Sequence, residues 1–72
     1  MIQANLRGRI IKGDSAGWFI KIHDDQENTG GYLVIQSKKL DFTGDGFDNW
    51  FETMGEVEQF LKYKNWGIEW LE

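Results

Sequence analysis

Apolar and polar side chains alternate through the first half of the sequence, and this alternation limits the fold more than any other feature of the chain. A period of two residues is typical of strands with one buried face. It predicts a strand over residues 2–10 and a second over residues 18–23, separated by a turn with two glycines at residues 13–17. Residues 32–37 begin with a continuous apolar run, as in a strand inside a sheet. Three strands with short connections predict an antiparallel meander.

The second half of the sequence predicts one helix and a last strand. Thr53 and Glu56 have the spacing of a capping box, and apolar residues follow at helical spacing, so we expect a helix over residues 54–64. Alternation then predicts a final strand over residues 66–71. The signal is weaker before the helix, where residues 47–51 can form either an irregular edge strand or a loop. An edge strand has unpaired backbone groups through which a homodimer can form.

These elements predict an α+β fold, a single domain over residues 1–72 with the helix packed on one face of a small, mainly antiparallel sheet. A chain of 72 residues has little surface to bury, and this one has no cysteine for a disulfide. Its 11 aromatic side chains supply apolar mass for a core instead. A weaker interpretation is an aromatic platform that binds a carbohydrate or a single-stranded nucleic acid. The rings on predicted strands that could form it are Trp18, Tyr32, Trp66 and Trp70.

The charge distribution makes several functional classes poor candidates. Residues 1–40 carry six basic and four acidic side chains, whereas residues 41–72 carry two basic and eight acidic ones. This acidic chain lacks the clusters of Lys and Arg that bind double-stranded nucleic acid. No apolar run is long enough to cross a membrane, and the first residues lack the pattern of a secretory signal. We therefore expect a cytoplasmic protein that does not act at a membrane.

The most unusual segment covers residues 41–58, which contain six carboxylates and no Lys or Arg. Within it, two adjacent aromatic residues are flanked by acidic ones. An aromatic anchor can supply binding energy while surrounding carboxylates attract a positively charged partner. We expect a non-enzymatic protein-interaction module that binds a basic protein. The predicted protein-binding residues are Asp45, Asp48, Trp50, Phe51, Glu52 and Glu56.

Calcium binding is an alternative function for part of this segment. Residues 41–52 resemble the twelve-residue calcium loop of EF-hand proteins, with Gly46 at the position of the sharp turn. The resemblance implies calcium as a cofactor. However, the residues before the loop predict a strand where an EF-hand has a helix, so the alternative is a solitary calcium loop. Its metal ligands would be Asp41, Asp45, Asn49 and Glu52.

Catalytic residues have little support in the sequence. His23 is the only histidine, and Asp24 or Asp25 could orient it as a general base. No serine or threonine near it in the sequence carries the marks of a nucleophile. We therefore expect that the protein is not an enzyme.

Overall fold

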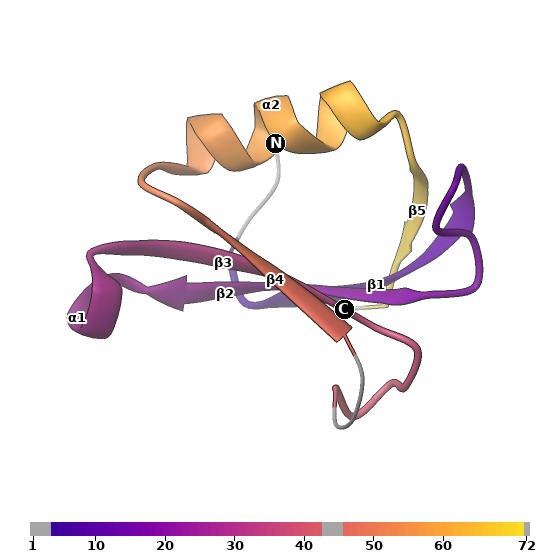
Figure 1. The fold of residues 1–72 in the computed structure, drawn as a ribbon, viewed down its shortest axis with the longest axis horizontal. Helices are drawn as coiled ribbons and strands as arrows, with labels where there is room; N and C mark the ends of the chain where they lie inside the picture. Colours follow the sequence, from indigo (N-terminus) through magenta and orange to yellow (C-terminus); the bar gives the residue numbers. More distant parts are fainter. Residues whose placement is uncertain (1–3, 43–45, 72) are drawn as a thin grey trace.

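The computed structural model describes residues 4–42 and 46–71, which form one sheet and two helices (Figure 1). The elements in chain order are β1 (Leu6–Lys12), β2 (Phe19–Asp25), α1 (Gln26–Thr29), β3 (Gly31–Ser37), β4 (Gly46–Phe51), α2 (Met54–Lys64) and β5 (Gly67–Trp70). No helix in these ranges is both long enough and apolar enough to cross a membrane.

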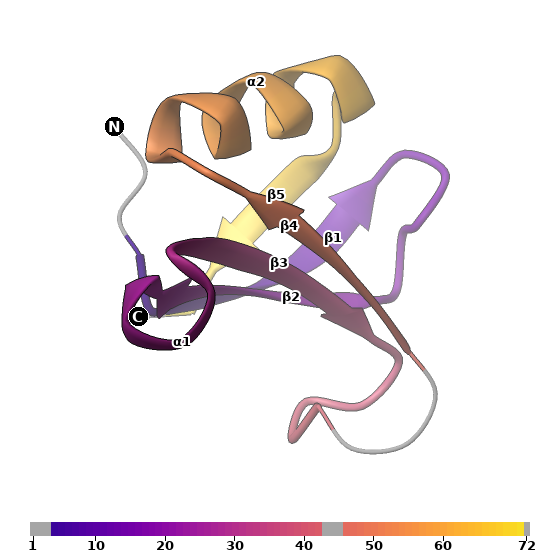
Figure 2. The same ribbon diagram turned by 60° about the vertical axis from the view of Figure 1, so that its left-hand side comes forward.

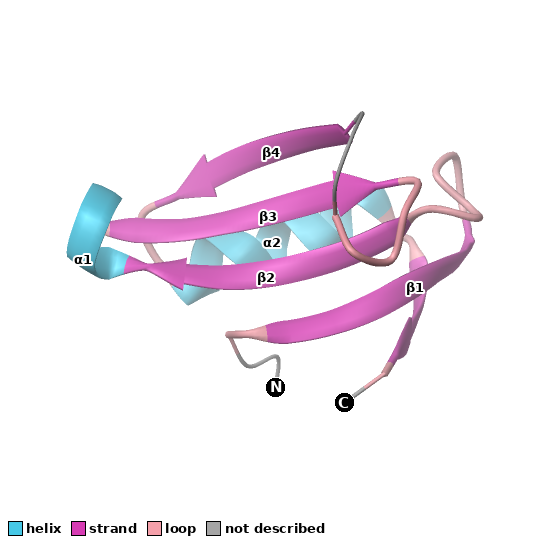
Figure 3. Ribbon diagram, turned by 90° about the horizontal axis from the view of Figure 1, so that it is seen from below, coloured by secondary structure: helices cyan, strands magenta, loops and turns pink. Residues whose placement is uncertain are grey.

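The five strands form an antiparallel sheet in the order β4-β3-β2-β1-β5. The first three strands are a meander, as predicted, and β4 continues it by pairing with β3 (Figure 3). The chain then crosses the sheet through α2, and β5 pairs with β1 at the opposite side. The edge strands are therefore β4 and β5. The α+β fold class predicted from the sequence is confirmed.

Helix α2 lies on one face of the sheet, and the core fills the space between the two layers (Figure 2). The fully or nearly buried apolar residues are Ile10, Ile20, Ile22, Val34, Val57, Leu61 and Trp66. The other three aromatic residues named on predicted strands, Trp18, Tyr32 and Trp70, pack around this cluster and are partly buried. The alternation of apolar and polar residues in the strands therefore indicates which side chains face α2.

Helix α2 begins and ends at the residues that the sequence indicates. The backbone N–H of Glu56 donates to Thr53 Oγ1 at 3.2 Å, and the backbone N–H of Thr53 donates to Glu56 Oε1 at 3.2 Å. This capping box satisfies backbone donors that a helix start leaves without partners. At the other end Asn65 adopts a left-handed conformation with φ 55°, and its N–H bonds to carbonyls of the last turn.

Two segments were left open or unassigned by the sequence. Residues 46–51, for which we considered an irregular edge strand or a loop, form a regular edge strand that pairs with β3 over six residues. The polar segment after β2 contains the short helix α1, to which the sequence pattern assigned no element. Asn28 Nδ2 donates to Asp25 Oδ1 at 3.1 Å, and Gly30 ends the turn in a left-handed conformation with φ 80°. Local side-chain and glycine chemistry therefore orders this connection.

Candidate functional site

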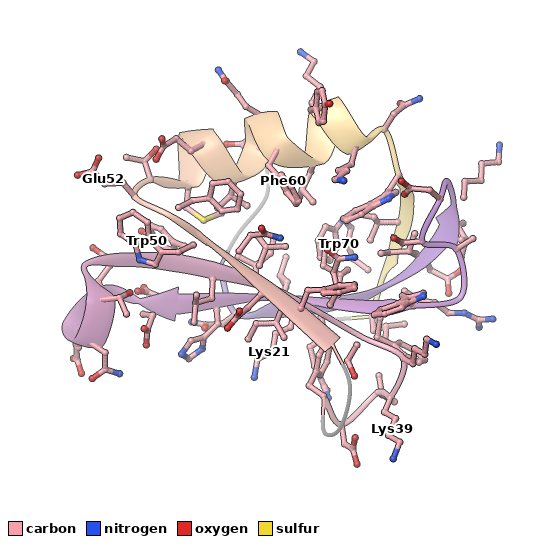
Figure 4. The ribbon with its side chains drawn as sticks, viewed as in Figure 1. Lys21, Lys39, Trp50, Glu52, Phe60 and Trp70 are labelled. Carbon is pink, nitrogen blue, oxygen red and sulfur yellow. The ribbon has the colours of Figure 1, made fainter. Side chains whose placement is uncertain are left out.

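Trp50 is the most distinctive exposed side chain of the predicted interaction segment. It lies on β4, opposite Leu33 of β3, and 49% of its surface is exposed. Its indole Nε1–H donates to Thr29 Oγ1 of α1 at 2.9 Å. Figure 4 shows the ring beside α1, at the end of β4 where Glu52 follows. The ring is therefore half exposed but held in one orientation.

Gly31 makes this position of Trp50 geometrically feasible. A Cβ atom added to Gly31 would lie 2.7 Å from the indole atoms Cε2 and Nε1, and it would also meet the carbonyl oxygen of Phe51. The indole thus packs directly against the backbone at the start of β3. Thr29 and Gly31 were not among the predicted site residues, because their role depends on the pairing of β3 with β4.

Trp50 stands where two acidic segments of the chain meet. Residues 22–37 and 40–61 contain no Lys or Arg, and the contact of Trp50 with Thr29 and Gly31 brings these two segments together. We call this part of the molecule the acidic end. It consists of Trp50 with Asp24, Asp25, Glu27, Asp48, Glu52 and Glu56.

A surface hollow of about 540 Å³ lies beside α1 at the acidic end. Asp25, which lines the hollow, stands opposite Gly31 in the β2–β3 ladder, so the hollow and Trp50 flank the same pair of residues. The other residues that line it are Asn5, His23, Asp24, Gln26, Glu27 and Asn28. Carboxylate oxygens and amide groups dominate this lining, which suits a positively charged group.

Hydrogen bonds stabilise the charged form of Asp25. The bond from the Asn28 side chain, supported by Thr29 and His23, lowers the pKa of Asp25 below its ordinary value of 3.8 despite the opposing effect of desolvation. The nearest oxygen of Asp25 lies 3.4 Å from His23 Nε2. The carboxylate therefore stays negative down to acidic pH.

The structure separates the predicted protein-binding residues into two groups. Asp48 and Trp50 point to the sheet face away from α2, where their ladder partners are Ile35 and Leu33. Phe51 points to the opposite face, where its ring centroid lies 5.0 Å from that of Phe60, so it belongs to the packing under the helix.

The remaining predicted residues of this set lie around the start of α2. Glu52 is exposed at the end of β4, next to Trp50 in sequence. Glu56 is exposed as well, but Oε1 of its carboxylate accepts the backbone N–H groups of Glu52 and Thr53. Asp45 lies outside the described residues.

The proposed calcium ligands are not brought together in the part of the chain that the structure describes. Asp41 lines a shallow hollow with Arg7 and Lys39, whereas Glu52 follows the far end of β4. Asn49 and Glu52 are separated by extended backbone, about 10 Å at the usual rise per strand residue. Asp45 is not described, and among residues 4–42 and 46–71 no group of three or more His, Asp or Glu side chains could hold a metal ion.

The four rings considered for an aromatic platform are buried or partly buried, and one stacked aromatic pair lies at the margin of the core. Trp66 is 9% exposed, and its Nε1–H donates to Asp14 Oδ1 at 2.8 Å. Trp18 stacks on Phe47 with ring centroids 5.3 Å apart, and Lys38 Nζ lies 5.4 Å from the Trp18 ring. Phe47, which sequence reasoning did not assign to the platform, is the exposed member of this pair.

Comparison with protein families, curated proteins and solved structures finds no match for the chain. Its function must therefore be argued from the site.

Proposed function

We propose that the protein is a non-enzymatic interaction module that binds a basic protein surface through the acidic end. The single observation that carries this proposal is the half-exposed indole of Trp50, fixed by Thr29 and Gly31 where two acidic segments without Lys or Arg meet. Aromatic anchors near the centre of an interface contribute much of the binding energy, and surrounding charges increase the association rate and select the partner.

The fixed orientation of Trp50 favours binding over a purely structural role for its exposed surface. A side chain that is already ordered loses less conformational entropy when a partner covers it. The flat indole also accepts an arginine or lysine on its face through a cation–π contact. One side chain can therefore serve as both an apolar anchor and a site for a cation.

The hollow beside α1 gives the acidic end a second place for a basic side chain. Glu27 and Asp24 line it, and the hydrogen bonds of Asp25 favour its ionised form. A lysine or arginine in this hollow would lie near carboxylates while the remainder of the partner covers Trp50. We expect the partner to present two or more basic side chains around an exposed apolar patch.

The test compares proteins captured from a native lysate by the immobilised chain and by its variants. We expect basic proteins to be retained by the wild type and lost with Trp50→Ala, which should weaken binding by about 2 kcal/mol as hot-spot residues do. The double variant Glu27→Gln/Glu52→Gln should also lose them.

The matched control is Glu69→Gln, which removes one exposed carboxylate on β5, away from the acidic end. It should retain the same proteins as the wild type. The proposal fails if Trp50→Ala, shown to be folded by circular dichroism, retains the same basic proteins as the wild type.

A further inference from the structure

Strand β4 is an edge strand with few of the features that usually protect a sheet edge. Its six residues pair with β3 in an unbroken register, and β4 contains no proline and no lysine. Five of the six residues are exposed. By contrast, β5 at the other edge has four residues, and its pairing with β1 shifts register between Ile10 and Lys12. Long, regular and unprotected edges readily pair with another strand.

The backbone groups of β4 that face outward can be assigned from the close approaches at its two ends. The carbonyl oxygen of Phe51 lies against Gly31, and that of Gln36 lies against Gly46, so Phe51 and Phe47 exchange hydrogen bonds with β3. Hydrogen bonding alternates along an antiparallel ladder. The N–H and C=O groups of Asp48 and Trp50 therefore point away from the sheet.

We propose that β4 pairs antiparallel with β4 of a second copy, forming a symmetric dimer with one continuous sheet. The two-fold axis of such a pair is perpendicular to the sheet, so side chains on one face of β4 meet those on the same face of the second copy. Residues with even numbers then oppose even ones. Only a few registers of the β4–β4 pair satisfy this condition. They differ in which charged side chains lie opposite each other.

The register centred on Asn49 fits best. It places Asp48 opposite Trp50 of the second copy, where the outward backbone groups of these two residues can exchange hydrogen bonds twice in the dimer. It also places Phe47, whose side chain is 61% exposed, opposite Phe51 of the second copy. Registers centred on Asp48 or Trp50 are unfavourable because they set two carboxylates opposite each other, Asp48 with Asp48 or Asp48 with Glu52.

This register also leaves Glu52 without a carboxylate directly opposite it. Glu52 comes opposite Gly46 of the second copy, which pairs with Ser37 at the end of β3. Trp50 keeps its side chain on the open face of the sheet, where a basic partner can still reach it.

Sedimentation equilibrium and two variants of β4 test the dimer. The wild type, up to about 1 mM protein, should give a mass that rises from monomer to dimer. Trp50→Asp should weaken self-association about tenfold, because it sets a carboxylate opposite Asp48 of the other copy twice.

Tyr63→Asp is the matched control, since it places the same charge at an exposed aromatic position of α2 and should leave the dimer unchanged. Asp48→Pro removes an outward N–H without touching the β3 ladder, and it should abolish the dimer while circular dichroism stays native. A wild type that remains monomeric up to about 1 mM overturns the proposal. So does a folded Trp50→Asp variant that associates as well as the wild type.

Discussion

Single residues determine how the exposed indole of Trp50 is held. Thr29 accepts its only hydrogen-bond donor, and Gly31 provides the flat backbone surface beneath it. Neither residue stands out in the sequence, because a threonine and a glycine in a polar connection normally indicate a turn. The carboxylates of the site were visible in the sequence, but the contact that joins them was not.

Gly31→Ala should displace Trp50. The added methyl group would lie within 2.7 Å of the indole and against the Phe51 carbonyl, so either the ring or the strand must move. We expect a loss of stability of about 1–3 kcal/mol, as for other overpacked sites, and a changed NMR shift for the Trp50 indole N–H. Urea denaturation measures the first effect.

Gly55→Ala is the control. Gly55 lies in α2, and a Cβ atom added to it would meet only Thr53 Oγ1, at 3.7 Å. It should leave stability unchanged or raise it by up to about 1 kcal/mol. Equal behaviour of the two alanine variants would contradict the role assigned to Gly31.

Asp14 should make stability depend on pH in the acidic range. The hydrogen bond from the Trp66 side chain is the main cause that lowers the pKa of Asp14 below its ordinary value of 3.8. Since the folded state favours the ionised carboxylate, its contribution is present above that value and is lost as pH falls through the lowered pKa. Unfolding by urea at a series of pH values should show a shallower acid decline for Asp14→Asn than for the wild type. Parallel curves would contradict this assignment.

At the scale of elements, the sequence predicts best where local patterns decide the structure. The meander and α2 follow from alternation, helical spacing and the capping box at Thr53. Strand β4 was ambiguous because its residues lack a clean alternation and become a strand through pairing with β3. Helix α1 was missed because its four residues depend on the side chain of Asp25 and on Gly30, not on an apolar face.

The capping box should contribute measurably to α2. Thr53→Ala removes the acceptor of the Glu56 N–H, and we expect the free energy of unfolding to fall by about 1 kcal/mol. Thr53→Ser keeps the hydroxyl, so its free energy of unfolding should fall much less. Urea denaturation followed by circular dichroism compares the two, and equal losses would show that the hydroxyl is not the source of the effect.

At the scale of the whole molecule, acidic and basic side chains gather in different parts of the fold, although the net charge is only −4. The two segments without Lys or Arg meet at the acidic end, whereas Lys38 and Lys39 follow β3 at the other end of the β3–β4 ladder. Sequence reasoning found the acidic character of residues 41–58 but could not include Asp24 and Glu27. Their contribution arises only when α1 folds back beside Trp50.

The most direct test of the proposed function is an NMR titration of the isotope-labelled protein with a peptide rich in arginine and lysine. Binding at the acidic end should shift the Trp50 indole N–H and the amides of Glu27 and Glu52, and the shifts should fade as salt screens the carboxylates. Shifts that are absent, or that spread evenly over acidic residues such as Glu69 while the Trp50 signal stays fixed, would contradict the account.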